Sequence, residues 1–246
     1  CNADNSIIDN LTLIGNENNG LILTGGTENT TIKNSYFQDL EYGIYLYNSN
    51  SNILSNITTY SNNWYGIYLS FSNSNTFSNI TTYSNYDGIY LWYSNSNTLS
   101  NSKIYDNSNY GIFLYSAGKD GTNLIYNNLL NNTKNVGFGG TIYPNSWNTT
   151  KQAGENIIGG NYLGGNYWAK PDGTGYSQTC NDTDKDGFCD EPYTLATNNT
   201  DYLPLKYIPI IFSDLSYPQY VDDDEGKAII KIRVTSNIQT YNISQV

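Results

Sequence analysis

Four successive copies of one pattern read GIYLYNSNSNILSNITTYSNNWY (residues 43–65), GIYLSFSNSNTFSNITTYSNYD (66–87), GIYLWYSNSNTLSNSKIYDNSNY (88–110) and GIFLYS (111–116). Their opening glycines lie 23, 22 and 23 residues apart. A fixed period of this length is typical of a solenoid, in which each repeat forms one coil that stacks on the next.

Each copy begins with a segment that has the pattern of a half-buried strand. In GIYL the aliphatic residues alternate with an aromatic one, which is the period-2 signature of such a strand. We expect three columns to point inward: Ile44, Ile67, Ile89 and Ile112; Leu46, Leu69, Leu91 and Leu114; and Leu54, Phe77 and Leu99. Asn, Ser and Thr at this density favour turns and strands over helices, and the L-x-x-L-x-L consensus of a leucine-rich repeat is missing. The sequence therefore predicts an all-β fold, a right-handed parallel β-helix with coils about 4.8 Å apart.

Equivalent positions of successive coils are expected to stack as columns. Two columns are amides, which can hydrogen-bond along the axis and satisfy a polar turn: Asn52, Asn75 and Asn97, and Asn56, Asn79 and Asn101. We interpret these asparagines as turn-building residues. A third column is aromatic and is expected to face outward: Tyr45, Tyr68, Tyr90 and Phe113. Such a stripe could bind sugar rings or a neighbouring subunit, or its rings could simply stack on one another.

The composition excludes several classes of protein. The 246 residues suffice for six or seven coils and an extension. A formal net charge of −11 and a pI near 4.2 argue against nucleic-acid partners, because phosphate binding needs basic clusters. No apolar run is long enough to predict a transmembrane segment, and no signal peptide is visible. Since the chain opens at Cys1 within coil-like sequence, we expect a mature or trimmed segment of something longer.

Three regions are predicted along the chain. Residues 1–168 are expected to contain the coils and an irregular closing coil, because an open last coil would leave strand edges unpaired. Residues 169–205 form an Asp-rich segment with a calcium loop and a disulfide. Residues 206–246 form a short C-terminal β extension. This extension is either the start of a truncated immunoglobulin-like domain or a set of strands that completes the sheet of a neighbouring subunit.

The Asp-rich segment contains one sharp motif, D-x-D-x-D-G, which begins at Asp182. Alternate residues of such a loop point at one centre, and its glycine allows a sharp turn, so the carboxylates can surround Ca²⁺. The predicted calcium ligands are the side chains of Asp182, Asp184 and Asp186, the carbonyl of Phe188, and Asp190 directly or through water. The twelfth position is Tyr193 instead of Glu, so another carboxylate would have to complete the shell. The alternative is a merely solvated acidic turn.

Cys180 and Cys189 flank this loop, and they could close it as a disulfide in an oxidising compartment. Zinc is less suited, since two cysteines without a histidine make a poor tetrahedral set. Cys1 is left over, to pair with upstream sequence or with another chain. With the acidic composition, the N-x-S/T acceptors predict an extracellular, glycosylated surface: Asn10, Asn29, Asn56, Asn79, Asn131, Asn148, Asn181, Asn198 and Asn242.

These segments together resemble a known family. The GIYL coils, NSWNTTKQAGENIIGGNYLGGNYW (residues 145–168), the aspartate loop, PYTL and DYLPL look like archaeal cell-surface proteins with NosD-type parallel β-helix repeats. The resemblance covers roughly residues 1–205. It implies a right-handed β-helix, export, and a surface-layer, sheath or adhesive role. The family's name derives from a copper-site maturation protein, but this chain has no His and no Met to which copper binding could be transferred.

The residues argue against catalysis. A β-helix lyase resembles a site with Ca²⁺ and an Arg or Lys base, but the single arginine, Arg233, lies outside the coils. A glycosidase needs two carboxylates at one bond, whereas Asp87 and Asp106 lie at different coil positions and are expected to stay solvated. Histidine, the commonest general acid–base group, is absent.

We therefore expect a non-catalytic structural protein of the cell surface. It would self-assemble as a homo-oligomer into an extracellular layer, sheath or filament that calcium stabilises. One alternative is a polysaccharide-binding or adhesive surface module, which uses the aromatic column. A less favoured alternative is a polysaccharide lyase or hydrolase.

Overall fold

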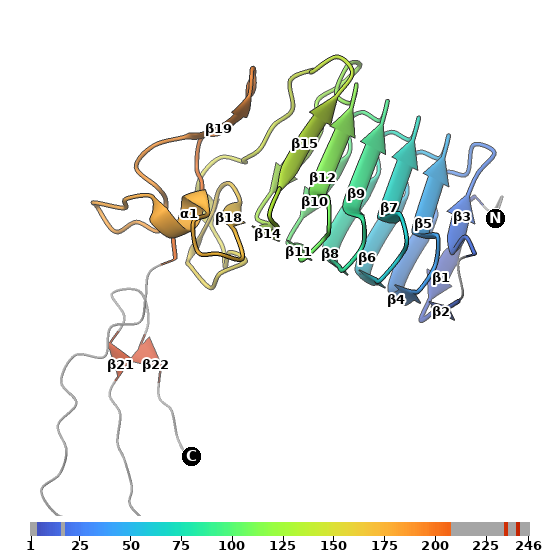
Figure 1. Cartoon of the computed structure of the whole chain (residues 1–246), viewed down its shortest axis with the longest axis horizontal. Coiled ribbons are helices and arrows are strands. Elements are labelled where there is room, and N and C mark those ends of the chain that lie inside the picture. Colours follow the sequence, from blue (N-terminus) through green and yellow to red (C-terminus); the bar gives the residue numbers. More distant parts are fainter. Residues whose placement is uncertain (1–3, 16–17, 208–233, 236–239, 242–246) are drawn as a thin grey trace, which may run out of the picture. The chain divides into compact units, whose positions relative to one another are not determined.

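The larger part of the chain is a solenoid built mostly of parallel strands. A computed structural model describes residues 4–15, 18–207, 234–235 and 240–241, which fall into two units, Cys1–Tyr207 and Ile208–Val246. In the first unit the coils stack on one another in the order of the sequence (Figure 1). The predicted parallel β-helix is therefore confirmed.

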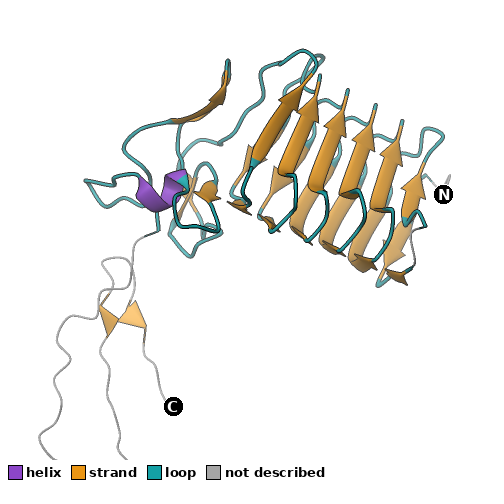
Figure 2. Cartoon of the chain, in the orientation of Figure 1, coloured by secondary structure: helices purple, strands orange, loops and turns teal. Residues whose placement is uncertain are grey.

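Two sheets run along the solenoid (Figure 2). The strands of the ten-stranded sheet are β1 (Ile7–Asp9), β2 (Thr12–Ile14), β4 (Thr31–Gln38), β6 (Ile53–Tyr60), β8 (Thr76–Tyr83), β10 (Thr98–Ser100), β11 (Lys103–Tyr105), β13 (Leu124–Tyr126), β14 (Leu129–Asn131) and β18 (Tyr167–Ala169). The other sheet, here called the aromatic sheet, has six strands: β3 (Leu21–Leu23), β5 (Tyr42–Tyr47), β7 (Tyr65–Ser70), β9 (Asp87–Trp92), β12 (Tyr110–Tyr115) and β15 (Val136–Gly139). Parallel pairing joins equivalent residues of neighbouring coils, so Ile67 lies between Ile44 and Ile89.

Aliphatic side chains from both sheets fill the interior of the solenoid. Every residue of the three predicted inward columns is at most 5% exposed. Burying one such side chain contributes about 1.5–3 kcal/mol, and the repeat supplies several in each coil. The period-2 pattern therefore identified the core correctly.

Each coil turns at corners where one residue adopts the left-handed conformation. Positive φ angles recur at equivalent positions of successive coils, in four columns: Asn5, Asn29, Ser51, Ser74 and Ser96; Asn10, Asn34, Asn56, Asn79, Asn101 and Asn127; Asp39, Ser61, Ser84 and Asp106; and Asn48, Phe71, Tyr93 and Ser116. Asn and Asp are well suited to such corners, because their short polar side chains bond locally and lower the steric cost. This explains why the repeats are so rich in asparagine.

The residue after a corner usually points inward and bonds to the neighbouring coil. Oδ1 of Asn75 accepts the backbone N–H of Asn52 at 2.9 Å, and Oδ1 of Asn97 accepts that of Asn75 at 2.9 Å. The predicted amide column is thus confirmed, and it continues through Asn123 and Asn145. Sequence analysis missed a second buried column of the same kind, formed by Asn62, Asn85, Asn107 and Asn132.

The other predicted amide column lies on the surface. Nδ2 of Asn56 donates to Oδ1 of Asn34 at 3.0 Å, and Nδ2 of Asn79 donates to Oδ1 of Asn56 at 3.2 Å. All three residues are exposed. Hydrogen bonds in water contribute less than buried ones, so this column orients the corner and adds little stability.

The C-terminal end of the coils is closed by two buried tryptophans and one short strand, β20 (Asn199–Asp201). Oδ1 of Asn199 accepts the backbone N–H of Asn145 at 3.1 Å and the indole N–H of Trp147 at 3.0 Å. Two residues later, Oδ2 of Asp201 accepts the backbone N–H of Asn166 and the indole N–H of Trp168, both at 2.8 Å. The strand therefore caps two amide columns at once, and it comes from the segment predicted as the Asp-rich region, residues 169–205.

The remaining elements are short. They are the antiparallel pair β16 (Gln152–Ala153) and β17 (Tyr162–Leu163), the helix α1 (Tyr176–Thr179), and β19 (Tyr193–Ala196), which pairs antiparallel with β20. In the second unit, β21 (Val234–Thr235) and β22 (Thr240–Tyr241) form an antiparallel pair. The rest of the predicted C-terminal extension after residue 207 lies outside the described residues, as does Cys1. Where the chain is described, none of its helices has the length and apolar character needed to cross a membrane.

Candidate functional site

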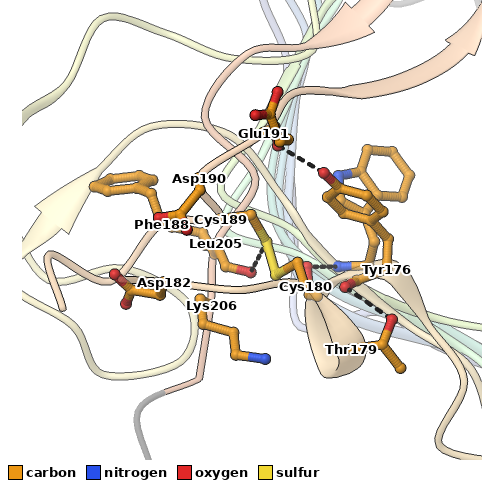
Figure 3. The surroundings of a disulfide bond; sticks show 12 residues. Tyr176, Thr179, Cys180, Asp182, Phe188, Cys189, Asp190, Glu191, Leu205 and Lys206 are labelled. Carbon is orange, nitrogen blue, oxygen red and sulfur yellow. Dashed lines mark hydrogen bonds between the residues drawn. A yellow bond between two sulfur atoms is a disulfide. The ribbon is translucent and has the colours of Figure 1, made fainter. Parts of the chain in front are cut away.

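The aspartate loop is tied to the closing end of the solenoid at several points. The sulfur atoms of Cys180 and Cys189 are bonded, which joins the two ends of the loop (Figure 3). The backbone N–H of Cys189 donates to the carbonyl of Pro204 at 2.8 Å, and that of Lys206 donates to the carbonyl of Gly187 at 2.9 Å. The loop is therefore held to the closing end by a disulfide and by backbone hydrogen bonds.

Three of the predicted calcium ligands lie together. Carboxylate oxygens of Asp182, Asp184 and Asp190 lie within 4.8 Å of one another. Both oxygens of Asp182 also accept backbone N–H groups, from Asp186 and Gly187, at 3.1 Å each. Burial raises the pKa of Asp182, the two backbone bonds lower it, and the nearby carboxyl groups of Asp186 and Asp184 raise it again. Clustered carboxylates of this kind repel one another, and a bound cation would relieve that repulsion.

Asp186 lies outside this cluster, although the motif predicted it as a ligand. Its Oδ2 pairs with the Nζ of Lys151 at 2.6 Å, and its Oδ1 accepts the backbone N–H of Phe188 at 3.0 Å. Lys151 lies 35 residues upstream of Asp186, so the loop sequence gave no sign of it.

Asp190 joins the cluster while it is held by a threonine. Its two oxygens accept the hydroxyl and the backbone N–H of Thr183, at 2.6 and 2.9 Å. The hydroxyl bond, followed by the backbone bond, lowers the pKa of Asp190. The carboxylate is thereby kept ionised, which is the state that a hard cation such as Ca²⁺ requires.

The predicted aromatic column lies on the outer face of the aromatic sheet, and its rings stack. The ring centroids of Tyr45 and Tyr68 lie 4.6 Å apart with an interplanar angle of 7°, and those of Tyr68 and Tyr90 lie 5.3 Å apart at 12°. Phe113 meets Tyr90 edge to face. Tyr90 is only 7% exposed. The faces of these rings are therefore largely occupied by their neighbours, which leaves little ring surface for a sugar.

Further aromatic rings flank this column on the same sheet. Tyr65 packs against Tyr90 with centroids 4.7 Å apart, and Trp92 stacks on Tyr115 at 4.3 Å. Burial raises the pKa of Tyr65 and of Tyr90, and the charge of nearby Asp87 adds to both shifts. These phenols therefore stay neutral at physiological pH, and the sheet presents an aromatic, uncharged surface.

Asp87 interrupts this surface, and the expectation that it is solvated was wrong. It takes the place that Tyr65 and Tyr110 occupy in the neighbouring coils, and it is 4% exposed. Its Oδ1 accepts the backbone N–H of Tyr110 and the side-chain amide of Asn109, both at 2.9 Å. Burial raises the pKa of Asp87, while these bonds and the charge of Lys134 lower it. The signal that could have found it was the alignment of the repeats, which sets one carboxylate in a tyrosine column.

The candidate glycosylation sites differ in accessibility. Asn10, Asn29, Asn56, Asn79, Asn181 and Asn198 are exposed, Asn131 and Asn148 are half-buried, and Asn242 lies outside the described residues. Three of the exposed sites, Asn10, Asn56 and Asn79, belong to one corner column. Glycans there would emerge from the same edge of the solenoid.

No curated protein matches the chain. Among solved structures, the crystal structure of pectate lyase Pel9A is similar at 12% identity with a TM-score of 0.38, over 58% of this chain and 48% of that one. The match thus spans about half the length of that structure. A family model described as periplasmic copper-binding protein (NosD) matches residues 1–173, which include all the coils and both buried tryptophans. The chain therefore belongs to the NosD family.

Proposed function

We propose that this chain is a non-catalytic structural protein of the cell exterior that self-assembles into a layer, sheath or filament. The observation that carries the proposal is the charge distribution of the aromatic sheet. Its six strands contain one charged residue, Asp87, and that residue is buried, whereas the whole chain has a formal net charge of −11. Copies of an acidic protein repel one another least where they meet across an uncharged, aromatic face.

The same sheet supports a non-catalytic role. Hydrolysis of a glycosidic bond needs two carboxylates that flank it, and the strands of the aromatic sheet provide only Asp87. That carboxylate is held by Tyr110 and Asn109. The chain has no histidine to serve as a general base.

The second part of the proposal is that Asp182, Asp184 and Asp190 bind Ca²⁺ and thereby stabilise the closing end of the solenoid. Oxygen ligands suit this hard cation. The family description names copper, but the residues of this chain do not fit that metal. It has no His and no Met, the sulfurs of Cys180 and Cys189 are bonded to each other, and Cys1 is the one further cysteine, so the imidazole and thioether ligands that suit copper are missing.

Electron microscopy and sedimentation of the purified chain, with calcium and after chelation, test the assembly. We expect ordered arrays with calcium, and their loss in Tyr68→Glu, which places a charge on the aromatic sheet. The matched control is Tyr83→Glu, which enters a stacked column on the other sheet. Single particles at high concentration in the presence of calcium would refute self-assembly.

A second candidate function is polysaccharide binding, as an adhesive surface module. The observation that favours it is a set of exposed rings just beyond the ends of strands β7 and β9. It does not depend on the stacked column Tyr45, Tyr68, Tyr90 and Phe113, whose ring faces are occupied.

A further inference from the structure

Large exposed aromatic rings gather around the middle coils of the aromatic sheet. They are Tyr47 at the end of β5, Trp64 and Phe71 on either side of β7, and Tyr86 and Tyr93 on either side of β9, each 38–48% exposed. We call these five residues the exposed aromatic band. The same flanking positions carry Glu41 and Asn48 around β5, and Asn109 and Ser116 around β12. The extra rings are therefore a local departure from the repeat.

Two of these rings occupy corners that are poorly suited to them. Phe71 and Tyr93 have φ angles of 50° and 46°, in the same corner column as Asn48 and Ser116. A bulky side chain in the left-handed region is a steric outlier, and such strain gathers at functional sites. Asn48 shows that asparagine fits this corner. The chain thus places exposed aromatic rings where a less strained residue would serve the fold.

The band has the dimensions of an elongated ligand. From Trp64 to Phe71 the chain runs along one strand, which spans roughly 23 Å at about 3.3 Å per residue. Across the sheet the band covers three coils, or about 10 Å at the usual strand spacing. A stable protein–protein interface buries about 800 Å² on each partner, several times this area. The shape therefore favours a narrow chain that lies along the strands over a second folded protein.

The chemistry of the surroundings favours a neutral ligand. No Lys or Arg lies on β5, β7 or β9 or at the positions that flank these strands. Lys134 lies over the ring of Tyr110 on the next coil, 5.1 Å from its centroid, so the exposed aromatic band itself offers a polyanion no counter-charge. Ring faces bind the apolar faces of sugars, and Tyr and Trp add a polar group at the edge. The rings of Phe71 and Tyr93 are parallel, with centroids 5.4 Å apart and an interplanar angle of 7°. One face of the Phe71 ring therefore contacts Tyr93, and the other is directed toward the coil of Asn48, a much smaller residue.

We infer that the exposed aromatic band binds a neutral polysaccharide chain, which lies along β7 and β9 across the middle coils. This inference rests on the second candidate function, and it names the ligand class and the residues. Asp87, buried between the rings, is not a contact in this arrangement.

Affinity electrophoresis in gels that contain a neutral β-glucan, a neutral α-glucan or a neutral mannan tests the inference, with polygalacturonate as the anionic control. We expect the full chain to be retarded by at least one neutral polymer and not by polygalacturonate. Phe71→Asn with Tyr93→Asn should weaken that binding about tenfold, since two rings are lost. The melting temperature should stay the same or rise, because asparagine relieves the strain at both corners. The matched control is Tyr60→Ala with Tyr83→Ala, a stacked pair on the other sheet, which should bind as the original chain does.

Several results would overturn the inference. They are no retardation by any of the three neutral polymers, equal weakening in the control pair, or stronger retardation by polygalacturonate. A fourth is that the Asn pair leaves binding intact but abolishes self-association in sedimentation, which would assign the band to a second copy of the chain. Because glycan binding and self-assembly are measured in separate experiments, a failure of the glycan site and a failure of the structural proposal can be told apart.

Discussion

Replacing Asp201 by Asn should change how the stability of this protein depends on pH. Asp201 is fully buried beneath the last coil, where its Oδ2 accepts the backbone N–H of Asn166 and the indole N–H of Trp168, and its Oδ1 accepts the backbone N–H of Leu203 at 3.0 Å. Burial raises the pKa of this carboxyl from 3.8 to about 6, against the pull of these bonds. Asn199, two residues earlier, shows that an amide oxygen can accept an equivalent pair of donors.

The magnitude follows from the difference in pKa between the folded and unfolded chains. One unit of pKa corresponds to about 1.4 kcal/mol, so a rise from 3.8 to about 6 corresponds to about 3 kcal/mol. Because the folded pKa is the higher one, this contribution is fully present below pH 3.8 and is lost as pH rises through about 6. The pKa of about 6 already includes the opposing effect of the N–H donors, which favour the ionised form.

The assay is denaturant unfolding of both proteins between pH 4 and pH 8. A chelator is present, so that calcium binding does not add its own pH dependence. Indole fluorescence reports in part on the cap, since two of the four tryptophans, Trp147 and Trp168, lie beneath it. As pH rises from 4 to 8, the original chain should lose up to about 3 kcal/mol in free energy of unfolding that Asp201→Asn does not lose. Any hydrogen bond lost in the variant costs the same at every pH and cancels in this difference. Parallel pH profiles for the two proteins would refute the assignment of the raised pKa to Asp201.

Three other predictions concern the loop and the ladders. Calcium at 100 times its Kd should add about 2.7 kcal/mol to the free energy of unfolding, and chelation should remove this gain. Asp184→Ala should abolish the sensitivity to calcium. If calcium leaves the melting temperature of the original chain unchanged, the loop is only an acidic turn. Lys151→Gln should tighten calcium binding in calorimetry, because it frees Asp186 to approach the cluster, and unchanged affinity would show that Asp186 stays outside. Asn97→Ala should lower the free energy of unfolding by about 2–4 kcal/mol, since it leaves buried donors of Asn75 without a partner. Asn79→Gly, in the exposed column, should lower it by less than about 1 kcal/mol. Equal losses in chemical unfolding would contradict the difference between the two columns.

Most of the coil could be read from the sequence because its contacts are local in the repeat. Each inward Ile or Leu of the aromatic sheet meets its counterpart 22 or 23 residues away, so aligning the copies aligns the neighbours in space. The same reasoning identified the amide column of Asn52, Asn75 and Asn97. It missed the column of Asn62, Asn85 and Asn107, because an inward Asn after a polar corner looks like any other turn residue in a segment rich in Asn and Ser.

The closure and the acidic loop were less predictable because their contacts break the period. Asn128 meets Asn166, 38 residues away, and Asn166 meets Asp201, 35 residues away. No spacing in the repeats gives these distances. In the loop, the D-x-D-x-D-G motif brought Asp182 and Asp184 together as its geometry implies, but the partner of Asp186 comes from a distant segment.

The residues of greatest functional interest are those that depart from their own columns. A consensus residue of the coil, such as Ile67 or Asn75, is fully explained by burial or by a ladder bond, so its presence says nothing beyond stability. Phe71 and Tyr93 occupy corners at which an asparagine, as at position 48, would be less strained, and stability alone would not select them. The Phe71–Tyr93 stack and the edge-to-face contacts of Tyr93 with Trp92 and Tyr115 contribute about 0.5–1.5 kcal/mol each, against about 1–2 kcal/mol of strain at each corner. Packing among the rings therefore offsets the strain about evenly and adds little net stability, whereas a bound partner at the exposed aromatic band would supply a net gain.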